Sequence, residues 1–259
     1  MSLPLVQTLG RWAIDRSQSY TRMARILGQT GSAFARLSFF NPAVFFVLVR
    51  QVYFTAVQPL TIIIVAALIL GSVTVHILLR ILLSLGAYEQ IGAYLVTAML
   101  HYIAPITCTL IIVLRSGTAV LTEVALMKIN REIATLDALA VPVAEYLYLP
   151  RLTAFLIAGP CLSFCFCIVG LFGGFFTLGF LHDITFASYL DRLLEAVHVF
   201  DVLTMIAKST IMAGLVCLVA LQRGLSVQRS FTEVPIRLIQ GMIQTVTLII
   251  AVEVLFNLF

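Results

Sequence analysis

Residues 51–79 read QVYFTAVQPLTIIIVAALILGSVTVHILL, a run of 29 residues without Asp, Glu, Lys or Arg. An α-helix needs about 20 mostly apolar residues to cross the hydrocarbon core of a bilayer, so this run is long enough for one crossing. Residues 90–114 and 152–182 form two more charge-free runs, of 25 and 31 residues. On length alone, three segments of the chain are expected to span a membrane.

The composition of the whole chain leads to the same conclusion. Of its 259 residues, 61% are apolar and only 11% are charged, whereas soluble chains carry roughly 25% charged residues. With a mean hydropathy of +1.08, the chain has too few polar side chains to cover a globule in water. These numbers exclude a soluble domain, a disordered chain, a collagen and a disulfide scaffold, and they predict an all-α integral membrane protein.

Two further apolar runs carry one ionisable residue each, Lys208 and Glu253. The sequence thus predicts five transmembrane helices, near residues 58–79, 91–114, 152–180, 202–221 and 238–258. As a straight helix the third charge-free run would reach about 45 Å, so we expect it to tilt, kink at Pro160 or protrude. The spacing of Gly170 and Gly174 permits close helix packing, although glycine is also frequent in membrane helices generally.

The basic residues predict the orientation of these helices. Thirteen of the 16 Lys and Arg residues lie before the first span, between spans two and three, or between spans four and five. Basic residues concentrate in cytoplasmic loops, so the N-terminus is predicted to be cytoplasmic and the C-terminus periplasmic.

Residues 1–50 are predicted to be an amphipathic segment that lies on the cytoplasmic leaflet. On a helical wheel its polar residues gather on one face, with Arg16 as the exception, and its apolar residues gather on the other. We expect a break near Gly28 and Gly31. Residues 39–49 are expected to dip into the interface, because 11 residues are too few to span the membrane. The polar face comprises Arg11, Asp15, Gln18, Arg22, Arg25, Gln29 and Arg36, and the apolar face Leu9, Trp12, Tyr20, Met23, Leu27 and Phe34.

Sequence motifs for catalysis, ATP binding or metal binding are not found. The only lysines, Lys128 and Lys208, are not part of a phosphate-binding GxxxxGK[ST] loop, and neither HExxH nor GxSxG occurs. The five cysteines lie within predicted spans, where small apolar packing roles are favoured over a soft-metal site at Cys161 and Cys165. We expect no cofactor, no metal, no nucleic-acid partner and no enzymatic activity of this chain itself.

Ionisable and polar residues within the spans are costly and therefore informative. The predicted orientation places six of them in the outer half of the bilayer: His76, Arg80, His101, Tyr102, Lys208 and Glu253. Two interpretations are open. The first is a Lys208–Glu253 ion pair that fixes helix packing, with the histidines hydrogen-bonded inside the bundle. The second is an outward-facing cavity that accepts an amphipathic or anionic head group.

The predicted cytoplasmic loop 115–151 is rich in mixed charge. Ile129, Ile133 and Leu136 recur at helical spacing among charged residues, which predicts a short amphipathic helix able to dock on a partner. A solvated surface loop is the alternative. The interspersed charges are Lys128, Arg131, Glu132 and Asp137.

The same loop resembles the MlaE/YrbE family, the permease subunits of ABC transporters that move lipids together with MCE proteins. Residues 114–119 (LRSGTA), with Glu123 and Met127, resemble its GRxGSAxxAExGxM signature. Residues 131–141 (REIATLDALAV) and 146–151 (YLYLPR) are similar to its TEQIDALEVMGV and YLVVPR segments. The chain departs from the family at residues 101–105 (HYIAP), where the family has Arg-Glu-Leu-Gly-Pro.

The resemblance implies a single permease domain over residues 1–259, with a five-helix bundle over 58–258. Its function would be to carry phospholipid between an inner membrane and a periplasmic MCE protein, as in systems for outer membrane lipid asymmetry. A separate cytoplasmic ABC ATPase would use the ATP. Other implied partners are a second permease copy or paralogue, and a small STAS-type subunit.

The resemblance also implies roles for individual residues. A lipid head group would lie near Arg80 or Lys208, within the set of six polar residues named above. The coupling residues that meet the ATPase would be Arg115, Glu123, Lys128, Arg131, Glu132, Ile133, Leu136 and Asp137.

Two functions of other classes are weighed against this one. A proton-coupled secondary transporter could use His101, Lys208 and Glu253, but the sequence shows no internal repeat of the kind many such folds have. A lipid-modifying enzyme could use His76 or His101, but neither histidine has a nucleophile or acidic partner at helical spacing.

Overall fold

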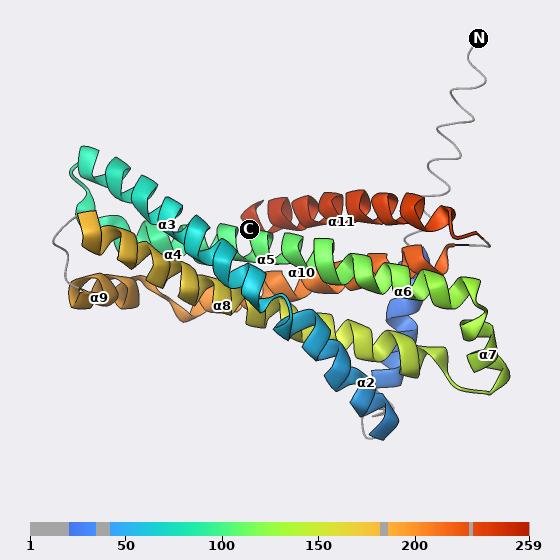
Figure 1. Cartoon of the computed structure of the whole chain (residues 1–259). Coiled ribbons are helices and arrows are strands. Elements are labelled where there is room, and N and C mark those ends of the chain that lie inside the picture. Colours follow the sequence, from blue (N-terminus) through green and yellow to red (C-terminus); the bar gives the residue numbers. More distant parts are fainter. Residues whose placement is uncertain (1–20, 35–41, 182–185, 228–229, 259) are drawn as a thin grey trace, which may run out of the picture.

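The computed structural model describes residues 21–34, 42–181, 186–227 and 230–258. These residues form helices joined by short turns (Figure 1). Five helical stretches are long and apolar enough to span a membrane: Val44–Ser84, Ile91–Ile129, Ala144–Phe176, Val199–Leu225 and Glu233–Leu258. The prediction of an all-α protein with five transmembrane helices is confirmed.

The first span begins earlier than expected. Helix α2 (Pro42–Val52) continues through a π-helical segment, η2 (Tyr53–Val57), and a short turn into α3 (Leu60–Ser84). Residues 42–50, which we assigned to the interfacial segment, therefore belong to the helix that leads into this span. Residues 35–41 lie outside the described part of the chain.

The second span is a long helix with two π-helical interruptions. A 3₁₀ turn, η3 (Tyr88–Gln90), leads into this span. It then comprises α4 (Ile91–Val96), η4 (Thr97–Ile103), α5 (Ala104–Ile112), η5 (Val113–Gly117) and α6 (Thr118–Ile129). Because the helix continues to Ile129 rather than ending near residue 114, the loop after it is much shorter than the predicted 115–151.

The remaining elements complete the bundle. After the short helix α7 (Glu132–Ala138), the segment η6 (Ala144–Tyr148) leads into α8 (Leu149–Leu181), which is continuous through Pro160. Helices α10 (Val199–Leu225) and α11 (Glu233–Leu258) form the last two spans. In the chain, α9 (Phe186–Ala196) lies between α8 and α10, in a segment to which the sequence analysis assigned no helix. Helices α7 and α9 lie at opposite ends of the bundle (Figure 1).

Helix α8 packs against both α3 and α10, and glycines permit the close approach. A side chain at Gly71 would clash with the backbone of Gly170, and one at Gly174 would clash with Val75. On the α10 side, a Cβ atom at Gly159 would lie 2.6 Å from the Ser209 carbonyl oxygen. Gly170 and Gly174 therefore provide the small-residue packing surface that their spacing permits.

The N-terminal helical residues 21–34 are amphipathic, as their pattern predicts, but their buried side packs on the protein. Met23 and Ile26 are buried in the main core, whereas Leu27 and Phe34 of the predicted apolar face are 46% and 57% exposed. The helix is continuous across Gly28 and Gly31, so the predicted break there is wrong. Arg22, Arg25 and Gln29 of the predicted polar face are exposed, as expected. The other residues of the predicted faces lie within 1–20 and 35–41, outside the described residues.

Candidate functional site

The loop end of the bundle is built by a sharp turn between α6 and α7. Arg131 adopts a left-handed conformation (φ 61°) between the end of α6 and the start of α7 at Glu132, and so turns the chain there. The amphipathic helix expected across Ile129, Ile133 and Leu136 is therefore two helices. The side chain of Ile133 is buried, Leu136 is half-buried, and the charged residues Lys128, Arg131, Glu132 and Asp137 are exposed.

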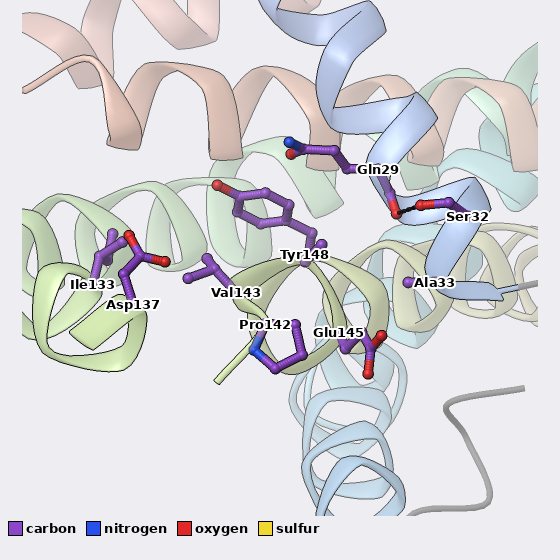
Figure 2. A pocket seen from close by; sticks show the side chains of 10 residues that line it. Gln29, Ser32, Ala33, Ile133, Asp137, Pro142, Val143, Glu145 and Tyr148 are labelled. Atoms are coloured by element: carbon purple, nitrogen blue, oxygen red, sulfur yellow. Dashed lines mark hydrogen bonds between the residues drawn. The ribbon is translucent and has the colours of Figure 1, made fainter. Parts of the chain in front are cut away.

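A groove of about 400 Å³ lies beside α7. Figure 2 shows Tyr148 within it, with Gln29 and Ser32 from the N-terminal helix on one side and Ile133 and Asp137 from α7 on another. The groove therefore joins the N-terminal helix, α7 and η6 in one concave surface. The remaining lining residues are Ala33, Pro142, Val143, Ala144 and Glu145.

Two of the predicted coupling residues lie within the bundle rather than on α7. Glu123 on α6 forms an ion pair with Arg151 on α8, with 2.9 Å between Oε2 and Nη2. Arg115 on η5 donates from Nη1 to the Phe54 carbonyl oxygen at 3.1 Å and from Nη2 to Gln58 Oε1 at 2.5 Å. Arg115 and Glu123 thus connect neighbouring spans, although the Glu123 side chain is 57% exposed. The other six predicted coupling residues lie at the end of α6, in the turn after it or on α7.

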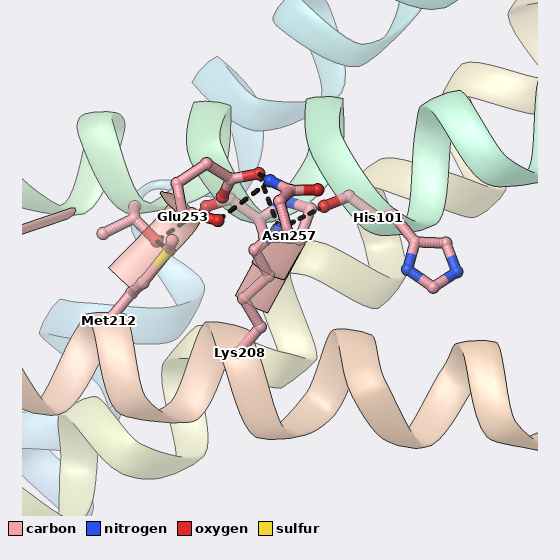
Figure 3. Close-up of polar contacts among 7 residues, drawn as sticks. His101, Lys208, Met212, Glu253 and Asn257 are labelled. Atoms are coloured by element: carbon pink, nitrogen blue, oxygen red, sulfur yellow. Dashed lines mark hydrogen bonds and ion pairs between the residues drawn. The ribbon is translucent and has the colours of Figure 1, made fainter. Parts of the chain in front are cut away.

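Four of the six predicted polar residues of the spans form one cluster centred on Lys208 of α10 (Figure 3). The Lys208 ammonium donates to Glu253 Oε1 on α11 at 2.6 Å and to the His101 carbonyl oxygen on η4 at 2.6 Å. It also lies 5.4 Å from the centre of the Tyr102 ring. Lys208 is only 2% exposed, and these contacts offset the cost of a buried charge in a membrane-spanning helix.

The local sequence explains why the His101 carbonyl accepts a bond from lysine. In an α-helix this oxygen would accept from the N–H of the residue four positions later, but that residue is Pro105, which has no N–H. The π-helical segment η4 ends just before this proline. The lysine therefore satisfies a backbone acceptor that the proline leaves available.

Two residues that sequence reasoning missed extend the cluster. His101 Nε2 lies 3.0 Å from Asp201 Oδ1, and Asp201 Oδ2 accepts from the His198 backbone N–H that begins α10. Asn257 Nδ2 donates to the Glu253 carbonyl oxygen at 2.8 Å and contacts its Oε1 at 3.3 Å. His101 thus has an acidic partner, but from another helix, which spacing along one helix cannot reveal.

His76 and Arg80 do not join this cluster. Arg80 donates to His76 Nε2 at 2.9 Å along α3, and within the described chain neither bonds to Lys208, Glu253 or His101. The six residues predicted for one lipid site thus fall into two groups. Because Lys208 is buried and paired, its ammonium is closed to a ligand in this conformation, and a substrate role for the six residues stays a prediction.

Comparison with known proteins places the whole arrangement in a family. Residues 48–259 match the model of the MlaE permease family. The chain belongs to this family. It is 28% identical over 177 residues to the intermembrane phospholipid transport system permease protein MlaE of Haemophilus influenzae, a match over 67% of this chain and 65% of that protein.

Two further relatives of this MlaE-family chain carry broader names. A probable ABC transporter permease protein of Rickettsia typhi is 23% identical over 225 residues, covering 86% of this chain and 85% of the relative. A probable ABC transporter permease protein of Pyropia yezoensis is 25% identical over 179 residues, covering 69% and 68%. The resemblance noted in the loop is confirmed, and the chain is a multi-pass permease of the MlaE family.

Proposed function

We propose that this protein is the membrane subunit of an ABC transporter that moves phospholipid between the inner membrane and a periplasmic MCE protein. A separate cytoplasmic ATPase binds and hydrolyses the ATP, and a second permease copy or paralogue completes the transmembrane unit. A small STAS-type subunit is a further partner. The observation that carries the proposal is the family match over residues 48–259, supported by the phospholipid system named for the Haemophilus relative.

The loop end of the bundle suits an ATPase partner. Helix α7 carries exposed charges, and the groove beside it is open between three elements of the same end. The predicted orientation puts this end in the cytoplasm because the basic residues concentrate there. A push on α7 reaches the spans through α6, whose Glu123 is paired with Arg151 at the start of α8.

The Lys208 cluster suits a contact that changes during transport. It joins η4, α10 and α11, so any separation of these helices must break or replace its ionic contacts. A ligand shifts such an equilibrium only if its affinity differs between the two states. A lipid phosphate that replaces Glu253 as partner of Lys208 in the open state would provide that difference.

The test is ATP hydrolysis by the purified permease–ATPase complex, with and without added phospholipid. We expect phospholipid to stimulate hydrolysis. Asp137→Ala, on exposed α7, should lower the hydrolysis, because it removes a charge from the docking surface. Asp191→Ala is the matched control, since it removes an exposed charge from α9 at the opposite end. Equal hydrolysis with and without phospholipid, in a complex that stays assembled, would contradict the proposal.

A proton-coupled transporter remains the second candidate, favoured by one observation. The pairs His101–Asp201 and Lys208–Glu253 are adjacent through residue 101 and together offer protonatable groups inside the bundle. This function predicts lipid uptake into vesicles driven by a proton gradient in the absence of any ATPase. Uptake that requires ATP and ignores the gradient would exclude it.

A further inference from the structure

A second polar cleft lies at the loop end of the bundle, away from the Lys208 cluster. Its volume is about 640 Å³, and it lies between α2 and η2 on one side and η5, α6 and η6 on the other. Arg115 in this cleft is 14 residues from His101 along the same span, which corresponds to about 21 Å of helix. The two sites are therefore in opposite halves of the bundle.

The cleft carries an excess of positive charge. Arg50, Arg115 and Arg151 all line it, and Glu123 is the single carboxylate among its lining residues. Glu123 is paired with Arg151. Arg115 bonds only to neutral oxygens, and Arg50 lies over the Phe54 ring at 5.6 Å. Two positive charges in the cleft thus lack a carboxylate partner within the described residues.

Buried polar atoms without a hydrogen-bond partner line the same cleft. These are Thr55 Oγ1, Ser116 Oγ and Arg151 Nε, from residues that are 0%, 6% and 6% exposed. Buried donors are normally satisfied, and these three atoms have almost no accessible surface in the unliganded conformation, so an acceptor that enters the cleft reaches them only when the side chains around it shift. Each of the three can donate a hydrogen bond, and a phosphate group offers several acceptor oxygens in a small volume.

One wall of the cleft, formed by α2 and η2, carries exposed aromatic side chains. Phe46 and Phe54 line it and are 72% and 41% exposed, on a helical stretch that leads into the first span. Exposed aromatic side chains at such a position face lipid. A ligand that reaches the arginines from this side must therefore pass an apolar wall.

We propose that this cleft binds the phosphate of an anionic phospholipid from the leaflet at the α7 end. The guanidinium groups of Arg50 and Arg115 contact the phosphate, Thr55 and Ser116 donate to it, and the acyl chains lie against Phe46 and Phe54. With the predicted orientation this is the cytoplasmic leaflet. The site is separate from the proposed transport activity, because binding requires no ATPase or MCE partner.

Native mass spectrometry of the full chain in detergent tests this proposal. The probes are dioleoyl phosphatidylglycerol, dioleoylglycerol, which has the same chains without the phosphate, and inorganic phosphate as a competitor. Arg50→Gln removes one charge from the cleft, and Ser116→Ala removes an unpaired hydroxyl without breaking a bond within the protein. Arg25→Gln is the matched control, since Arg25 is an exposed arginine outside the cleft.

We expect phosphatidylglycerol to bind, dioleoylglycerol to bind far more weakly, and inorganic phosphate to displace little lipid. Arg50→Gln should weaken phosphatidylglycerol binding about tenfold, the loss of one charge-assisted contact, and Ser116→Ala should weaken it less. Arg25→Gln should bind like the unaltered protein. Equal affinities of the Arg50→Gln and Arg25→Gln variants would overturn the proposal. Full displacement by inorganic phosphate would also overturn it, in favour of a soluble phosphate ligand.

Discussion

Replacement of Glu253 by leucine isolates the energetic role of the Lys208 cluster. The substitution introduces an apolar side chain of similar volume. It leaves the ammonium of Lys208, whose side chain is 3% exposed, with the His101 carbonyl as its remaining hydrogen-bond acceptor. Removing one partner of a buried ion pair typically costs about 3–5 kcal/mol, because the other charge stays buried. We expect a loss of this size in the free energy of unfolding.

The reverse substitution, Lys208→Met, should cost less. It leaves the Glu253 carboxylate still contacted by Asn257 Nδ2, which lies 3.3 Å from Oε1 one turn along the same helix, so the stranded charge keeps one side-chain donor. We expect a loss of about 1–3 kcal/mol from the unmet hydrogen bonds. The double variant replaces the pair with apolar groups and should lose about 1–2 kcal/mol, less than Glu253→Leu alone.

The assay is unfolding of the purified protein in mixed micelles, with helix content followed as denaturing detergent is added. A matched cycle at Arg237 and Glu233, a half-buried pair one turn apart on α11, should show a coupling of only about 0.3–0.5 kcal/mol. If the losses at Lys208 and Glu253 simply add, the two residues do not stabilise each other and the reasoning is refuted.

Three further predictions concern the loop end and the helix packing. Glu123→Lys places a second cation against Arg151 and should lower lipid-stimulated ATP hydrolysis at least tenfold while the protein stays in the membrane; full activity would show that the ion pair does not transmit coupling. Leu136→Pro, inside α7, should abolish ATPase recruitment because proline breaks the helix, whereas Leu136→Ala should retain it; a pull-down with the tagged ATPase distinguishes them. Gly71→Ala should destabilise the protein by about 1–3 kcal/mol, because the new Cβ atom meets the Gly170 backbone. Gly170→Ala should cost less, because the closest obstacle to its Cβ atom is the flexible end of Met99. Thermal unfolding in detergent that ranks the two variants in the opposite order would contradict the packing argument.

The sequence predicts the spans well because charge-free length is a property of each segment by itself. The five crossings follow from the positions of the charged residues, and the two charges left inside spans, Lys208 and Glu253, are the ones that pair. The boundaries are less predictable, since Arg115 lies within a continuous helix although a charge normally marks the end of a span. Helix α9 was missed because its charges are typical of a loop.

The contacts between helices depend on geometry that a residue list does not contain. Asp201 lies 100 positions from His101, and only the packing of α10 against the second span brings the two side chains together. Arg115 matches the coupling motif by its position in the sequence, yet its guanidinium bonds to residues of the first span. The motif thus pointed to Arg115, but it did not show that the Arg115 side chain contacts the first span.

The two cationic contacts between spans share one origin in the backbone. The N–H of Gln58 bonds to the Tyr53 carbonyl, five residues back, which leaves the Phe54 carbonyl without its usual α-helical donor. The next residue that could donate to it is Pro59, which has no N–H, so Arg115 donates instead.

Lys208 satisfies the His101 carbonyl in the same way, at a position where Pro105 supplies no donor. In each case a π-helical segment lies close to a proline, a carbonyl lacks its usual α-helical donor, and a cation from a different span donates to it. An unpaired carbonyl in a membrane is costly, so the cation stabilises the π-helical segment as much as the segment binds the cation. The prolines at positions 59 and 105 therefore mark the backbone carbonyls, five and four residues earlier, to which Arg115 and Lys208 donate.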